Sequence, residues 1–166
     1  MASRPKVYVA GPLGFSESGR RYHESVVLPA LVDAGFEPLD PWVLEAAELA
    51  VFALERGHRD RIARLPDVNR AIGARNAELI RAASCVLAIL DGSDVDSGTA
   101  AEIGYAAARS RPVVGLRTDL RPGGDNEATT VNLQVEWFVE STGGTICTTL
   151  DRAIQALTRL VAAGGN

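Results

Sequence analysis

Short apolar runs alternate along the chain with longer segments whose apolar residues recur at helical spacing. The runs are rich in β-forming side chains and are bounded by Gly, Pro or Asp, which is typical of strands. The predicted strands cover residues 6–10, 36–39, 85–90, 112–116 and 145–147. The run 85–90 is the most apolar, as expected for a strand buried on both faces of a parallel sheet.

The segments between these strands predict helices. They cover residues 17–34, 43–54, 68–83, 100–109, 131–140 and 150–163. Strands that alternate with helices through short connections predict an α/β three-layer sandwich with a parallel sheet. We expect one domain over residues 1–166. Ligands bind beyond the carboxyl ends of such strands, so loops 11–15, 40–42 and 91–99 are candidate parts of a site.

Composition and charge exclude several classes of function. The net charge of -4 argues against a nucleic-acid polymer as partner, and no apolar segment predicts a membrane span or a secretion signal, so we expect a cytoplasmic protein. Cys85 and Cys147 are too few for a disulfide framework, and His23 and His58 have no cysteine neighbours, so no metal site is expected. Lys6 is the sole lysine and opens a predicted strand, which argues against Schiff-base chemistry.

The loop after the most apolar strand carries the strongest candidate chemistry. In Asp96-Ser97-Gly98-Thr99-Ala100-Ala101-Glu102, we expect Gly98 to allow a close turn and Thr99 to cap the next helix. Glu102 then falls in the first helical turn, where the helix dipole favours an ionised carboxylate. Asp96 adds a second carboxylate, and such pairs serve glycosidic chemistry. The alternative is that Glu102 only completes a capping box with Thr99, while Asp96 is a solvated loop acid.

Three segments together resemble the nucleoside 2-deoxyribosyltransferase family. They are KVYVAGPLGF, NAELIRAASCVLAILDGSDVDSGTAAEIGYA and, more loosely, RTDLRPGGDNEATTVNLQVEWF. The motif DSGTAAEIGYA is the most specific of these. The resemblance implies a flavodoxin-like three-layer sandwich with a five-stranded, mostly parallel sheet, and an enzyme that needs no metal or cofactor.

The resemblance also implies roles for individual residues. Glu102 attacks C1′ of a deoxynucleoside, Tyr8 orients Glu102, and Asp96 protonates or holds the departing base. Asn132 of a neighbouring subunit binds the sugar hydroxyl, which requires a homo-oligomer. The remaining predicted substrate-binding residues are Gly11, Pro12, Leu13, Phe15, Asp40, Trp42, Asn76, Ser97 and Gly98.

Several alternatives stay open at this point. Several relatives carry an aspartate where this chain has Asn76, and an amide can bind a base but cannot act as a general acid. Tyr8 and Trp42 are also typical packing residues, and Asn132 is a typical helix cap. Transfer of deoxyribose between bases is the leading hypothesis. Hydrolysis of deoxynucleosides or their 5′-monophosphates is the closest rival, and a non-catalytic nucleotide sensor is the third.

Overall fold

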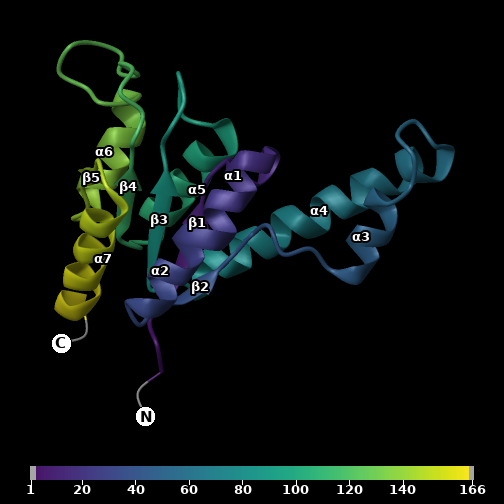
Figure 1. Ribbon diagram of the computed structural model, residues 1–166, viewed down its shortest axis with the longest axis horizontal. Coiled ribbons are helices and arrows are strands. Elements are labelled where there is room, and N and C mark those ends of the chain that lie inside the picture. The colour runs from purple at the N-terminus through teal and green to yellow at the C-terminus, as the bar shows by residue number, and fades with distance from the viewer. Residues whose placement is uncertain (1–2, 165–166) are drawn as a thin grey trace.

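The computed structural model describes residues 3–164, which contain a five-stranded sheet of order β2-β1-β3-β4-β5 (Figure 1). All neighbouring strands in it are parallel. The strands are β1 (Lys6–Ala10), β2 (Glu37–Leu39), β3 (Cys85–Ile89), β4 (Val113–Leu116) and β5 (Ile146–Cys147). This is the strand order of flavodoxin. The predicted α/β sandwich is therefore confirmed.

The helical elements connect the strands. They are η1 (Leu13–Phe15), α1 (Glu17–Tyr22), the π-helical turn η2 (His23–Val27), α2 (Leu28–Asp33), α3 (Ala46–Phe52), α4 (Arg59–Ala82), α5 (Ser97–Ala108), α6 (Leu133–Ser141) and α7 (Leu150–Gly164). The helix predicted over residues 17–34 is thus one helical run with a π-turn in its middle. Within residues 3–164, no helix is both long and apolar enough to cross a membrane.

Each face of the sheet packs against its own helices. Val7 and Leu87 point to the face covered by α2 and α7, where they meet Leu31 and Leu157. Tyr8, next to Val7 in β1, points to the opposite face, which α4, α5 and α6 cover. Because successive side chains of a strand alternate between faces, this register sends the Tyr8 hydroxyl group toward α5.

Helix α4 begins at Arg59, so the prediction that it begins at residue 68 is wrong. It continues through Pro66, and the Nδ1 atom of His58 caps it by accepting from the amide of Asp60 at 3.2 Å. Arg61 also donates to two backbone carbonyls at the end of α3, at 2.6 and 2.7 Å. These contacts stabilise a helical first turn that local sequence pattern does not reveal. Figure 1 shows α3 and the first turns of α4 extending away from the sheet, and we call residues 43–72 the arm.

Candidate active site

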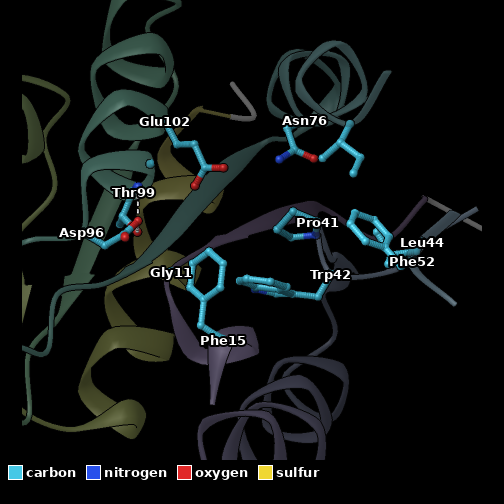
Figure 2. Close-up of a pocket in the computed structure, with 12 residues that line it drawn as sticks. Gly11, Phe15, Pro41, Trp42, Leu44, Phe52, Asn76, Asp96, Thr99 and Glu102 are labelled. Carbon is cyan, nitrogen blue, oxygen red and sulfur yellow. Dashed lines mark hydrogen bonds between the residues drawn. The ribbon is translucent and has the colours of Figure 1, made fainter. Parts of the chain in front are cut away.

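A cavity of about 460 Å³ lies at the carboxyl ends of β1 and β3, the point where the strand order reverses. All three predicted loops contribute to it, as does the arm (Figure 2). Its lining residues are Gly11, Phe15, Pro41, Trp42, Leu44, Phe52, Ile72, Asn76, Asp96, Gly98, Thr99 and Glu102. In the described chain this lining is mostly apolar, with two carboxylates at one end.

A short hydrogen bond joins Tyr8 to Glu102 at the carboxylate end. The Tyr8 hydroxyl donates to Glu102 Oε1 at 2.5 Å, and the Tyr8 side chain is fully buried. Burial, together with the negative charge of Glu102, raises the pKa of Tyr8 far above its usual value. The phenol therefore keeps its proton and acts as a fixed donor to one oxygen of Glu102.

Glu102 is held in a poorly solvated position. Burial raises its pKa above the usual value and the charge of Asp96 adds to this, while the hydrogen bond from Tyr8 partly offsets both. The prediction that Glu102 lies in the first turn of its helix is wrong. Helix α5 begins at Ser97 and has no acidic residue in its first turn, so Glu102 lies in the second turn. Burial rather than the helix dipole therefore dominates its ionisation.

Asp96, not Thr99, is the N-cap of α5. Its Oδ2 accepts from the amide of Thr99 at 3.0 Å and from the Thr99 hydroxyl at 3.2 Å. A Cβ atom at Gly98 would lie 3.1 Å from the same oxygen, so glycine lets the chain pass close to it. The alternative capping box between Thr99 and Glu102 does not form. Since Oδ2 is engaged in the cap, Oδ1 is the oxygen of Asp96 that is left to contact a ligand.

Two aromatic side chains form one wall of the cavity. The rings of Phe15 and Trp42 meet edge to face with centroids 4.7 Å apart, and Trp42 lies so close to Gly14 that a Cβ there would overlap the indole. Asp40 lies outside the cavity lining, contrary to the prediction, and supports this wall. Its Oδ1 accepts from the amide of Trp42 at 3.0 Å and lies 3.1 Å from Nε2 of buried His23. Burial alone would raise the pKa of Asp40, but these two contacts lower it.

Three other predicted residues do not line the cavity. Pro12 precedes the turn η1, Leu13 packs against the sheet core, and Ser97 is exposed at the start of α5. They shape the loops that carry Gly11, Phe15 and Gly98, so their contribution in this chain is to the backbone path.

Asn132 caps α6. Its Oδ1 accepts from the amides of Gln134 and Val135 at 3.0 and 3.4 Å. It does not line the cavity of its own chain. The capping alternative therefore describes what Asn132 does within one chain.

Asn76, a predicted substrate-binding residue, lines the cavity from α4. Its Oδ1 is buried, and residues 3–164 offer that atom no hydrogen-bond partner. A buried carbonyl oxygen without a partner is costly, so a donor on a ligand would be favoured there.

Five residues that line the cavity were not predicted as site residues, namely Pro41, Leu44, Phe52, Ile72 and Thr99. Pro41 and Thr99 stand inside predicted loops, and the other three belong to the arm. The sequence signal for the arm residues is the apolar stretch that directly follows the candidate loop 40–42. The described residues contain no group of three or more His, Cys, Asp or Glu side chains that could hold a metal ion.

Comparisons with known proteins address the family and the fold. The family model for nucleoside 2-deoxyribosyltransferases matches residues 7–136. A conserved protein from Enterococcus faecalis V583 has 24% identity and a TM-score of 0.65, covering 94% of this chain and 98% of its own. A 2-deoxyribosyltransferase from Leishmania mexicana has 23% identity and a TM-score of 0.62, covering 95% and 97%.

A CMP N-glycosidase from Clostridium botulinum shares the fold more distantly. It has 16% identity and a TM-score of 0.53, covering 93% of this chain and 98% of its own. No curated protein matches the chain by sequence. The structural likenesses show the fold, whereas the family model spans most of the chain. The chain therefore belongs to the nucleoside 2-deoxyribosyltransferase family.

Proposed function

We propose that this protein transfers 2-deoxyribose from a deoxynucleoside to a free nucleobase, with Glu102 as the nucleophile. The observation that carries the proposal is the buried hydrogen bond from Tyr8 to Glu102, at the end of a largely apolar cavity that also holds Asp96. A carboxylate fixed in this way, with a second acid on the same cavity, suits a glycosidic double displacement.

The steps follow from which oxygen atoms are engaged. Tyr8 binds Oε1 of Glu102, which leaves Oε2 to attack C1′. The bond from C1′ to the base nitrogen breaks as a deoxyribosyl ester forms. Asp96, which has taken up a proton from solvent on Oδ1, gives that proton to the departing base. A nitrogen of the second base then attacks C1′ and the ester bond breaks. The proton that this nitrogen carried passes to Asp96. Two inversions at C1′ give overall retention.

The charge of the cavity favours unphosphorylated substrates. Among the described residues that line it, two are acidic and none is Arg or Lys. A 5′-phosphate would meet repulsion without a cationic partner. Arg20 of α1 is a nearby cation, but it donates to the carbonyl of Gly14 at 3.0 Å and does not line the cavity. The aromatic wall of Phe15 and Trp42 favours a nucleobase over water as the acceptor, which supports transfer over hydrolysis.

The proposal includes a homo-oligomer in which Asn132 of one subunit reaches the sugar in the next. Oδ1 of Asn132 caps α6, and Nδ2 donates one hydrogen to Oδ1 of Asp125 at 3.5 Å, so the second hydrogen of Nδ2 is left to donate to a sugar hydroxyl. A mixing experiment tests this. Inactive Glu102→Ala and weakened Asn132→Ala proteins, unfolded and refolded together, should regain part of the activity. If the mixture is no more active than its components added together, the site is not shared.

Product analysis tests the function. The protein is incubated with deoxyinosine or thymidine plus adenine, and products are separated by chromatography. We expect deoxyadenosine, and its loss in Glu102→Gln but not in the matched control Glu127→Gln, which changes an exposed loop residue. Free deoxyribose alone would establish hydrolysis instead. Turnover of deoxynucleoside 5′-monophosphates only would overturn the assignment of an unphosphorylated substrate.

A further inference from the structure

We call the part of the cavity lined by Pro41, Leu44, Phe52 and Ile72 the chamber, and all four of these residues are apolar. In Figure 2, Leu44 and Phe52 lie on the side opposite Glu102 and Asp96, and Trp42 lies between them. The arm supplies three of the four chamber residues. No step of the proposed transfer uses this space.

Polar side chains are unevenly placed along the cavity. Asp96, Thr99 and Glu102 belong to the loop and helix that follow β3, whereas Asn76 is the polar lining residue of α4. Oδ1 of Asn76 is buried and lacks a partner in the part of the chain that the structure describes. One unpaired acceptor beside an apolar chamber calls for a ligand group with one N–H donor and an apolar continuation.

The reaction chemistry fixes how a substrate enters this space. C1′ must meet Glu102, so the base extends from there past Trp42. The edge of the base farthest from the glycosidic bond then faces Asn76 and the chamber. An unsubstituted exocyclic amino group has two N–H donors, and Asn76 Oδ1 can pair with one of them. The second would face apolar side chains, where burying an unpaired donor is unfavourable.

The chamber walls are held in place by contacts of the arm with itself and with the rest of α4. The buried carboxylate of Glu48 in α3 pairs with Arg75 of α4, with Nη1 and Oε1 2.7 Å apart. Arg61 of α4 binds the carbonyl of Phe52 at 2.6 Å. The chamber is therefore preformed by helix-to-helix contacts, so binding a ligand does not cost the free energy of ordering its walls.

We propose that the chamber receives an apolar substituent on the exocyclic amino group of the base. The substrate class is deoxynucleosides, and their free bases, in which this amino group carries an alkyl or aromatic group. Its remaining N–H donates to Oδ1 of Asn76, and the substituent packs against Leu44, Phe52 and Ile72. This inference rests on the proposed function for the direction in which the base lies.

Binding of free bases tests the chamber without requiring turnover. Calorimetric titration of the full chain compares adenine with N6-benzyladenine. We expect N6-benzyladenine to bind about tenfold more tightly or better, because a phenyl group leaves water for an apolar surface. Ile72→Asn should remove most of that preference. The matched control Ile62→Asn changes an exposed residue of the same helix and should keep it.

A second variant guards against misfolding. Leu44 lies outside the helices, and Leu44→Asn should also reduce the preference for N6-benzyladenine. Circular dichroism checks that each variant is folded. Equal affinity for the two bases would overturn the inference, as would an Ile72→Asn protein that is folded and keeps the full preference.

The outcomes separate this inference from the proposed function. If deoxyadenosine is a donor but the two bases bind equally, the function stands and the chamber assignment is wrong. If N6-benzyladenine binds more tightly in an Ile72-dependent way but no deoxynucleoside is turned over, the chamber stands and the proposed function is wrong.

Discussion

The two ends of the cavity are built from different parts of the fold. Tyr8 lies in β1 at the centre of the sheet and binds Glu102 of α5, so the carboxylate end rests on the hydrogen-bonded core. The chamber end belongs mainly to the arm, which extends away from the sheet and depends on helix-to-helix contacts such as that of Arg75 with Glu48. This difference leads us to expect that substitutions in the arm change which base is accepted without displacing Glu102, the proposed nucleophile.

The largest effect is expected at the carboxylate end, from Glu102→Gln. An amide cannot form the glycosyl ester, so kcat for transfer should fall by about a thousandfold or more. Steady-state kinetics with deoxyinosine and adenine measure this. A variant that keeps one tenth of normal activity would mean that another group attacks C1′.

Tyr8→Phe should have the next largest effect. Loss of a hydrogen bond to a charged group is expected to lower kcat about tenfold to a hundredfold. That bond also lowers the pKa of Glu102, so its removal raises this pKa further. The acidic limb of kcat/KM should therefore move to higher pH, because more Glu102 is protonated at a given pH. Tyr22→Phe, at a partly exposed tyrosine, is the matched control. An unchanged acidic limb in Tyr8→Phe would contradict the assigned role.

Trp42→Ala tests the aromatic wall of the cavity rather than the carboxylate end. Removing an aromatic wall should raise KM for the acceptor base about tenfold, since stacking on a base is worth about 1–3 kcal/mol. The kcat at saturating base should change little, because Tyr8 and Glu102 stay in place. A fall in kcat without a rise in KM would place Trp42 in the chemical step instead.

A smaller effect concerns stability. The folded-state pKa of Glu102 is raised by burial, so its ionised form costs folding free energy at neutral pH. Glu102→Gln should therefore raise the melting temperature by a few degrees at pH 7. The difference should shrink as pH falls through the folded-state pKa, because Glu102 then becomes neutral. Thermal unfolding of both proteins, followed by circular dichroism at pH 7 and at an acidic pH where Glu102 is neutral, checks this. Equal melting temperatures at pH 7 would show that Glu102 carries no such cost.

The sequence predicts the carboxylate end better than the chamber end. The alternation of apolar runs and helical segments is local, and it places Gly11, Trp42 and Glu102 at neighbouring strand ends through the known behaviour of parallel sheets. The motif around Glu102 then indicates the family, which the family model shows. These parts depend on contacts that the sheet topology itself imposes.

The remaining features depend on tertiary contacts or on competition between similar residues. Both Asp96 and Thr99 are good N-caps, and the sequence does not decide between them, although the choice moves Glu102 by one helical turn. The start of α4 depends on Arg61 binding the carbonyl of Phe52, the last residue of α3, and the carbonyl of Leu54 just beyond it. Leu44 and Ile72 are far apart in sequence, so their meeting in one chamber follows from the path of the arm rather than from local pattern.

Direct detection of the glycosyl ester tests the central claim, that Glu102 is the nucleophile. The protein is mixed with deoxyinosine without an acceptor base, quenched in acid, digested with pepsin and analysed by tandem mass spectrometry. We predict a peptide that carries one deoxyribosyl group on Glu102, and its disappearance when adenine is added before quenching. Turnover with unmodified Glu102 throughout, or a deoxyribosyl group on another residue, would contradict the account.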